Sequence, residues 1–183
     1  VQGSRDFAIL LLASSLGIRA SDICEMTLEA INFVKNELCF IQKKTSVPLT
    51  LPLLPDVKEA LLGYLGCRKI NSTDEPIFIQ CRAPYHKLTR MGIWTIMRRY
   101  LKQSGVDPGH RKRGTHALRS SLASSMVREQ VPYYAVQKIL GHESPQSTKN
   151  YVRIDIGRLR EFTLPVPEAY GRFDAFLKGG ETR

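Results

Sequence analysis

Two histidines, an arginine and a tyrosine follow one another in the C-terminal half of the chain. The segment Thr115-His-Ala-Leu-Arg119 is followed by Leu140-Gly-His142 and then by Tyr151. An arginine guanidinium can bind a phosphate diester through two parallel hydrogen bonds, and an imidazole transfers protons near neutral pH. A tyrosine hydroxyl becomes a covalent nucleophile once its proton is removed. These residue types in this order predict a protein that breaks a DNA strand and holds the end on its own side chain.

Two earlier stretches extend this pattern. Ser15-Leu-Gly-Ile-Arg19-Ala-Ser-Asp22 has an arginine soon after a glycine and an acid three residues later, and Gln42-Lys-Lys-Thr45 precedes Leu51-Pro52. Together with residues 114–119, 139–144 and 147–151, these stretches closely resemble the catalytic motifs of tyrosine recombinases of the phage-integrase type. The resemblance covers residues 5 to about 155, with the motifs in the family's order.

The resemblance implies a role for each of six side chains. Two arginines would stabilise a pentacoordinate phosphorane, so no metal and no cofactor is expected. One histidine would accept the tyrosine proton, the other would hydrogen-bond the phosphate, and a lysine would protonate the departing 5′ oxygen. Ser120 stands where many family members carry a histidine. The catalytic residues expected on this basis are Arg19, Lys44, His116, Arg119, His142 and Tyr151.

The identity of the lysine is open between two neighbours. Strand alternation places Lys43 and Lys44 on opposite faces, so only one can point at DNA. The similarity to the family's Lys-Thr pair favours Lys44, while a charged hairpin tip without chemistry is the alternative. Asp22 is expected to orient Arg19 or to stabilise the fold. Gly141 is expected to end a helix directly before His142.

The other tyrosines and the cysteines suggest no second site. Only Tyr151 lies nine residues after His142. Tyr64, Tyr100, Tyr133, Tyr134 and Tyr170 fit apolar faces and are expected to pack. The four cysteines are widely spaced and form no CxxC pair, which disfavours a metal site or a disulfide framework.

Positive charge gathers around the histidine, arginine and tyrosine set. Residues 82–160 hold 16 Lys/Arg against 4 Asp/Glu, while the remainder of the 183 residues holds 11 against 13. Such a field favours a polyanion, and nucleic acid is the commonest; a basic face that merely aids solubility is the alternative. The residues expected to grip the DNA backbone are Arg90, Arg98, Arg99, Arg111, Lys112, Arg113 and Lys149.

Hydrophobic periodicity predicts an α+β fold that is predominantly α-helical, with one small three-stranded antiparallel sheet. Strands are expected at 31–34, 38–43 and 47–51, with a tight turn near Thr45-Ser46. Ser21 is expected to cap a short helix, and Thr89 a longer one closed by Gly105. Helices are expected at 5–16, 55–69, 89–104, 116–129, 132–140, 146–152, 157–162 and 168–177. We expect residues 1–164 to form a tyrosine-recombinase catalytic domain without the family's N-terminal DNA-binding domain, and 165–183 a tail that docks on a neighbouring subunit.

The function expected from these features is site-specific DNA recombination or integration through a 3′-phosphotyrosine. The expected partners are double-stranded DNA and other copies of the chain, as a tetramer on paired sites and a monomer without DNA. No membrane partner is expected, because no long apolar run or signal peptide occurs. The predicted location is the bacterial cytoplasm, on the nucleoid. Two alternatives are a type IB topoisomerase and a non-catalytic helix-turn-helix regulator.

Overall fold

The computed structural model describes residues 1–68, 75–107, 109 and 113–141 of the chain. In chain order it has α1 (Gln2–Ser15), α2 (Ala20–Glu25), a 3-10 turn η1 (Leu28–Ala30), β1 (Ile31–Asn32), β2 (Glu37–Ile41), β3 (Pro48–Pro52), α3 (Pro55–Leu65), α4 (Arg90–Gln103), α5 (Thr115–Arg128) and α6 (Tyr133–Leu140). The predicted α+β class, mostly helical with one three-stranded antiparallel sheet, is confirmed. The helices expected beyond residue 141, and His142, Lys149, Tyr151, Arg111 and Lys112, lie outside the described residues.

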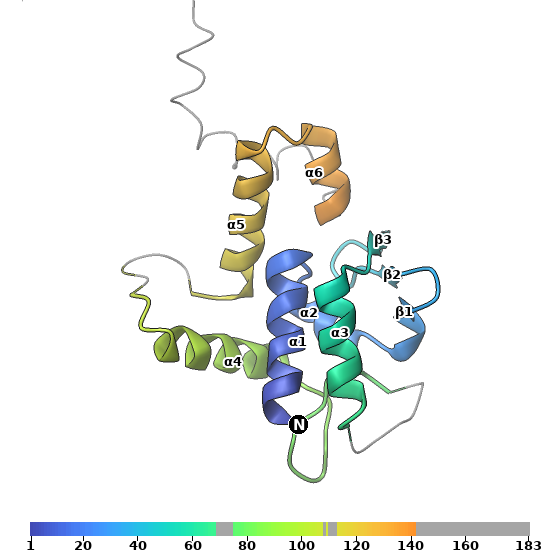
Figure 1. Cartoon of the computed structure of the whole chain (residues 1–183), viewed down its shortest axis with the longest axis vertical. Coiled ribbons are helices and arrows are strands. Elements are labelled where there is room, and N and C mark those ends of the chain that lie inside the picture. The colour runs from blue at the N-terminus through green and yellow to red at the C-terminus, as the bar shows by residue number, and fades with distance from the viewer. Residues whose placement is uncertain (69–74, 108, 110–112, 142–183) are drawn as a thin grey trace, which may run out of the picture.

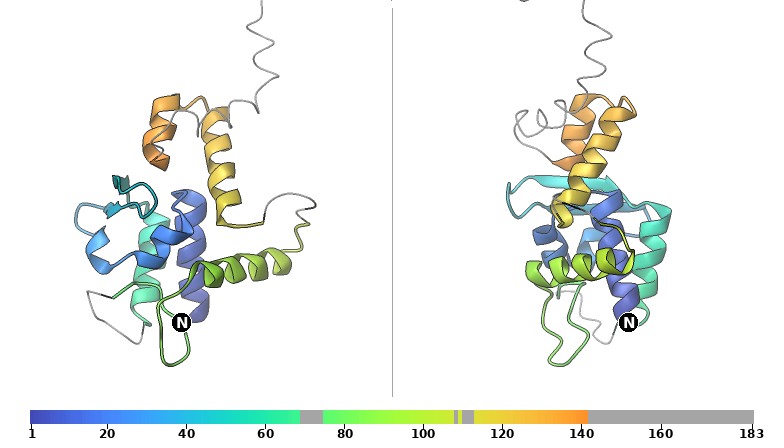
Figure 2. Two further views of the ribbon diagram at one scale, coloured as in Figure 1. Left: turned by 180° about the vertical axis from the view of Figure 1, so that it is seen from behind. Right: turned by 90° about the vertical axis from the view of Figure 1, so that its left-hand side faces the viewer.

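Helix α1 forms the centre of the described structure. Its residues Ala8, Ile9 and Leu12 are fully buried, and it packs against α3 along its length and against α5 near its C-terminal end (Figure 1). Helix α4 crosses the lower part of α1, and α5 and α6 form an antiparallel pair above it (Figure 2). That pair has its own small cluster of Ala123, Val136 and Leu140. The chain therefore brings α6 back over the sheet and the start of α2.

The strands occupy the predicted places: β1 and β2 are shorter than predicted, and β3 keeps its predicted length, shifted by one residue. The sheet order is β1-β2-β3, and Leu38 on β2 stands opposite Leu51 on β3. The predicted tight turn is present: Ser46 has φ +56° and its N–H donates to the Gln42 carbonyl at 2.8 Å. This turn makes a hairpin of β2 and β3, with Lys43 and Lys44 at its tip.

Glycines end the helices that carry the site. Gly17 after α1, Gly105 after α4 and Gly141 after α6 have φ of +64°, +70° and +58°, which confirms the predicted helix ends because glycine adopts this region without steric cost. The predicted Thr89 cap is also confirmed, since its hydroxyl accepts from the Gly92 N–H at 3.1 Å. The Ser21 cap is wrong: the N-cap of α2 is Arg19, two residues earlier, and it makes no side-chain cap.

None of the helices within the described ranges has the length and apolar character that a membrane crossing requires.

Candidate active site

Arg119 lies inside the fold, where its guanidinium is held by two backbone carbonyls. The residue is 3% exposed, on α5. Its Nη1 donates to the Gly17 carbonyl at 2.7 Å, and its Nη2 donates to the Leu140 carbonyl. Gly17 leaves room for this approach, because a Cβ there would lie 2.9 Å from Leu140 Cδ2. The ends of α1 and α6 thus fix the plane of this guanidinium.

Arg19 reaches the same place from the other side. It follows Gly17 and Ile18, directly before α2, and its Nη2 donates to the Gly141 carbonyl at 3.4 Å. Its Nη1 is buried and has no hydrogen-bond partner within the part of the chain that is described. Buried guanidinium nitrogens without a partner are rare in folded proteins. The two arginines, 100 positions apart in sequence, therefore converge on the turn at Gly141, directly before His142.

Asp22 does not pair with Arg19 in the described structure. Its Oδ1 accepts from the backbone N–H of Lys43 at 2.9 Å and from the Ser21 hydroxyl at 3.3 Å. The residue is 4% exposed. Of its two expected roles, stabilising the fold is therefore the one that the contacts support, since Asp22 ties α2 to the tip of the hairpin.

The two hairpin lysines lie in different environments. The Nζ of Lys43 donates to Oε1 of Glu25, whose Oε2 accepts from Lys87 Nζ at 2.8 Å. These hydrogen bonds, first from Lys43 and then from Lys87, lower the pKa of Glu25 below its ordinary value. Lys44 is exposed and makes no ion pair within the described ranges. It lines a hollow together with Lys43, Lys87 and Arg90.

Gln42 is a residue of this region that the sequence analysis did not single out. Its side chain is 1% exposed; its Nε2 donates to the Leu140 carbonyl at 3.3 Å, and its Oε1 accepts from the Thr45 hydroxyl at 2.8 Å. A signal was available, because Gln42 continues the alternation of Leu38 and Phe40 on the inward face of β2. A polar side chain at an inward-facing strand position is expected to be buried and hydrogen-bonded.

His116 lies in the first turn of α5 and is exposed. It precedes Arg119 by three residues, so the two side chains project from the same side of the helix, one turn apart. Buried Arg119 and solvent-facing His116 thus share one edge of α5.

The predicted DNA-binding arginines fall into two groups. Arg90, Arg98 and Arg113 are exposed; Arg98 stacks over the Trp94 ring at 5.3 Å, and Arg113 Nη2 donates to the Gly109 carbonyl at 2.9 Å. Arg99 instead pairs with Asp6, which is fully buried. The same carboxylate accepts two hydrogen bonds from Arg5. The contacts of Arg99 therefore favour a structural role over the predicted DNA contact.

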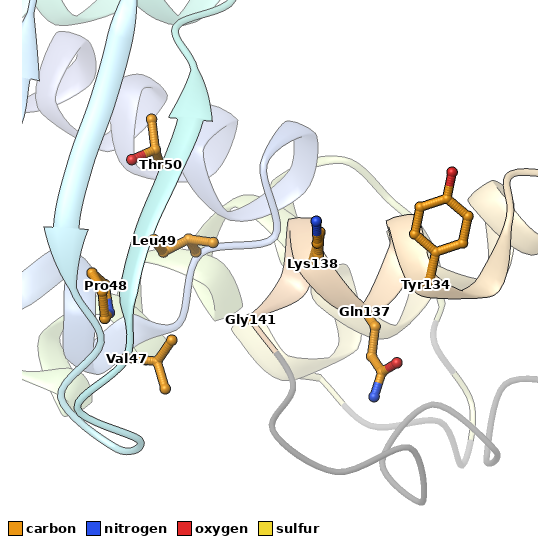
Figure 3. A pocket seen from close by; sticks show the side chains of 8 residues that line it. All are labelled: Val47, Pro48, Leu49, Thr50, Tyr134, Gln137, Lys138 and Gly141. Atoms are coloured by element: carbon orange, nitrogen blue, oxygen red, sulfur yellow. The ribbon is translucent and has the colours of Figure 1, made fainter.

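Two other potential nucleophiles, Tyr64 and Cys24, are buried in the core. Tyr64 is buried as predicted; burial raises the pKa of its hydroxyl, which donates to the Ile77 carbonyl at 3.1 Å. Burial also raises the pKa of the Cys24 thiol to about 11. The prediction that Tyr134 packs is wrong, because it is 67% exposed. It lines a groove of about 560 Å³ between β3 and α6 (Figure 3).

Comparison with known sequences and structures agrees with this geometry. Residues 1–158 match the Phage integrase family. The chain is 34% identical over 165 residues to the putative integrase/recombinase y4gC of Sinorhizobium fredii, which covers 90% of this chain and 84% of that protein. It is 31% identical over 163 residues to the tyrosine recombinase XerA of Pyrococcus furiosus, covering 86% of this chain. The chain spans about half the length of that relative, 53%.

Solved structures show the same fold. A crystal structure of XerA recombinase superposes with a TM-score of 0.72 at 21% identity, over 91% of this chain and 60% of that one. A lambda integrase dimer bound to a COC′ core site superposes with a TM-score of 0.62 at 25% identity, over 90% of this chain and 56% of that one. The predicted tyrosine-recombinase catalytic-domain fold is thereby confirmed. The chain belongs to the phage integrase family of tyrosine recombinases.

Proposed function

We propose that this chain is the catalytic domain of a site-specific DNA recombinase or integrase that works through a 3′-phosphotyrosine on Tyr151. The observation that carries the proposal is the convergence of Arg19, Arg119 and the lysine hairpin on the turn at Gly141. His142 follows that turn directly and Tyr151 follows nine residues later. Arg19, Arg119 and the lysine hairpin come from distant parts of the sequence. They thus meet directly before the segment that carries His142 and Tyr151.

The reaction follows from the groups present. The Tyr151 oxygen attacks the phosphorus while His116 takes its proton, and the bond from phosphorus to the 5′ oxygen breaks. Arg19, Arg119 and His142 hydrogen-bond the non-bridging oxygens, where negative charge develops. The departing 5′ oxygen takes a proton from Lys44. Religation is the same sequence in reverse, with the bond energy kept in the phosphotyrosine.

The ion pairing of the hairpin supports Lys44 over Lys43 as the acid. The ammonium group of Lys43 is engaged with Glu25, whereas that of Lys44 makes no ion pair within the described ranges. Both lysines line the same hollow, together with Lys87, Arg90 and Glu25. An ammonium group that is not held in an ion pair can donate its proton to the leaving oxygen.

The expected partners are double-stranded DNA and other copies of the chain. The basic residues Arg90, Arg98 and Arg113 are exposed on α4 and the segment before α5, and we propose that they hold the DNA backbone together with Arg111, Lys112 and Lys149. The lambda integrase relative was crystallised as a dimer on a DNA core site, which supports assembly on DNA. We extend this to a tetramer on paired sites, joined through residues 165–183, that acts on the nucleoid.

The first test is capture of the covalent adduct. Cells expressing the protein are lysed in detergent, protein-linked DNA is collected and sequenced, and the recovered site is rebuilt as a nicked suicide duplex. We expect an adduct that forms in EDTA and is lost in Tyr151→Phe. Site-independent relaxation of supercoils would indicate a topoisomerase. Binding to the site without any adduct would indicate a regulator and overturn the proposal.

The second test separates the two lysines. Lys44→Ala is expected to slow single-turnover cleavage about 100-fold or more, the usual contribution of general acid catalysis, and Lys43→Ala less than about fivefold. A duplex with a bridging 5′ sulfur needs no acid, because a thiolate leaves unprotonated. On that duplex Lys44→Ala should cleave at close to the unsubstituted rate. The opposite ranking of the two variants would assign the role to Lys43.

A further inference from the structure

Gln42 joins two parts of the site that are remote in sequence. Its Oε1 accepts from the Thr45 hydroxyl in the turn that carries Lys44, and its Nε2 donates to the Leu140 carbonyl at the end of α6. The side chain is 1% exposed. The Gln42 side-chain amide uses both its oxygen and its nitrogen in these hydrogen bonds, and it therefore links the lysine hairpin to α6.

The α6 end of this link is shared with Arg119. The Leu140 carbonyl accepts from Arg119 Nη2 as well as from Gln42 Nε2, which uses both of its lone pairs. The next residue, Gly141, lies directly against the amide: a Cβ at Gly141 would stand 2.3 Å from Gln42 Nε2. The position of Gln42 thus depends on the same carbonyl that fixes the Arg119 guanidinium.

A groove runs along the rest of this boundary. A groove of about 560 Å³ separates Val47, Pro48, Leu49 and Thr50 from the exposed side of α6 (Figure 3). In Figure 3 the end of α6 at Gly141 approaches the hairpin more closely than the start of the helix does. Gln42 lies at this close approach and contacts both sides of it.

From these contacts we propose that Gln42 is a positioning residue that sets the hairpin lysine relative to Arg119 and the Gly141 turn. This rests on the proposed function. Lys44 must reach the leaving oxygen of the same phosphate that the arginines bind, and a displacement of about 1 Å can cost about 100-fold in rate. Gln42 fixes that separation, because it is bonded to the turn of one group and to the carbonyl that holds the other.

The experiment compares Gln42→Met with Leu51→Met in the complete protein. Methionine matches glutamine in length but loses both hydrogen bonds, and Leu51, buried on β3, controls for repacking of the sheet. Single-turnover cleavage of the nicked duplex is measured with 5′ oxygen and with bridging 5′ sulfur. We expect Gln42→Met to be about 10- to 100-fold slower on the oxygen duplex and within about threefold of the unsubstituted protein on the sulfur duplex. Leu51→Met should stay within about threefold on both, and half-saturating protein concentrations should be unchanged.

A second variant and a second readout cover the case in which Gln42→Met folds poorly. Thr45→Val removes only the hydroxyl that donates to Gln42, and it should shift the oxygen-to-sulfur ratio in the same direction by a smaller factor. Without DNA, hydrogen exchange at the Lys43 and Ser46 amides should rise about tenfold in Gln42→Met and not in Leu51→Met, since those amides bond within the hairpin and to Asp22.

The outcomes distinguish the two proposals. Two results overturn the positioning role of Gln42 while the proposed function stands, provided that the unsubstituted protein cleaves. In one, the cleavage rate of Gln42→Met falls by the same factor on both duplexes; in the other, it does not fall at all. If the unsubstituted protein forms no adduct on either duplex, the proposed function fails and the role of Gln42 fails with it.

Discussion

Asp22 Oδ1 accepts a hydrogen bond of 2.9 Å from the backbone N–H of Lys43, 21 residues further along the chain. Asp22 lies in the first turn of α2, which begins directly after Arg19. The hydrogen bond therefore couples the segment that carries the first arginine to the hairpin that carries the lysines. An acid three residues after an arginine suggests a local ion pair from sequence alone, but in the fold it serves a distant part of the backbone.

Replacing Asp22 should release the hairpin. Asp22→Ala leaves the partly buried Lys43 N–H without its acceptor, which should lower the free energy of unfolding by about 1–3 kcal/mol. Asp22→Asn keeps an acceptor oxygen and should cost less. Urea unfolding measures the difference, and Asp56→Ala, an exposed acid in the first turn of α3, is the control at about 0.3–1 kcal/mol. A loss in Asp22→Ala no larger than in Asp56→Ala would contradict the coupling.

Two glycines that end helices should respond differently to alanine. Gly105 and Gly141 share a positive φ, but a Cβ at Gly105 meets nothing within 4 Å, whereas at Gly141 it meets Gln42 at 2.3 Å. Gly105→Ala should therefore cost only the left-handed backbone penalty of about 1–2 kcal/mol. Gly141→Ala should cost more and should also slow cleavage, because Gln42 or the Leu140 carbonyl must move. Urea unfolding and single-turnover cleavage of both variants check this. Equal losses of unfolding free energy in the two variants would show that the Gln42 side chain moves aside without cost.

The neighbouring arginines of α4 should separate into a DNA contact and a structural residue. Arg98→Ala should reduce by about one the slope of log affinity against log salt, as loss of one phosphate contact does, with stability unchanged. Arg99→Ala should lower the free energy of unfolding by about 1–3 kcal/mol, because among the described residues Asp6 then keeps only Arg5 as an ion-pair partner. Salt-dependent binding and urea unfolding of both variants test the assignment, and the reverse pattern would exclude it.

Much of this fold follows from local sequence signals. The helix ends at Gly17, Gly105 and Gly141 have a positive φ, which glycine adopts without steric cost, and the Thr89 side chain accepts a hydrogen bond at the start of α4. The Ser21 cap failed because the turn after Gly17 starts the helix two residues earlier, with its N-cap at Arg19. The lengths of β1 and β2 were overestimated because alternation continues past the last ladder pair into the turn.

The site was predictable in its residue types and not in its contacts. The motifs identified Arg19, Arg119 and the lysine hairpin, but that Leu140 and Gly141 carbonyls hold the guanidiniums depends on how α6 packs over α1. The ion pair of Arg99 with Asp6 joins residues 93 positions apart, a relation that no local pattern encodes. The sequence signals a buried Gln42, because it is a polar residue at an inward-facing position of the strand alternation. It does not signal that Gln42 bonds to the Leu140 carbonyl.

The ion pairs of Glu25 should make the free energy of unfolding depend on pH. Hydrogen bonds from Lys43 and Lys87 lower the pKa of Glu25 in the folded protein. A carboxyl whose pKa is lower in the folded state stabilises the fold when it is ionised. This stability is present above the ordinary pKa of glutamate, about 4.3, and is lost as the pH falls through the lowered folded value. Glu25 is 38% exposed at its side chain, so solvent screening limits the effect to about 1 kcal/mol or less.

Glu25→Gln should therefore be less stable than the unsubstituted protein at neutral pH and equal to it in strong acid. The exposed Glu29→Gln changes the charge equally and serves as the control, with little difference at neutral pH. Urea unfolding at both pH values gives the comparison, and high salt should shrink the neutral-pH difference because it screens exposed ion pairs. A difference for Glu25→Gln that persists in strong acid would mean that its ion pairs with Lys43 and Lys87 are not the source of the stability.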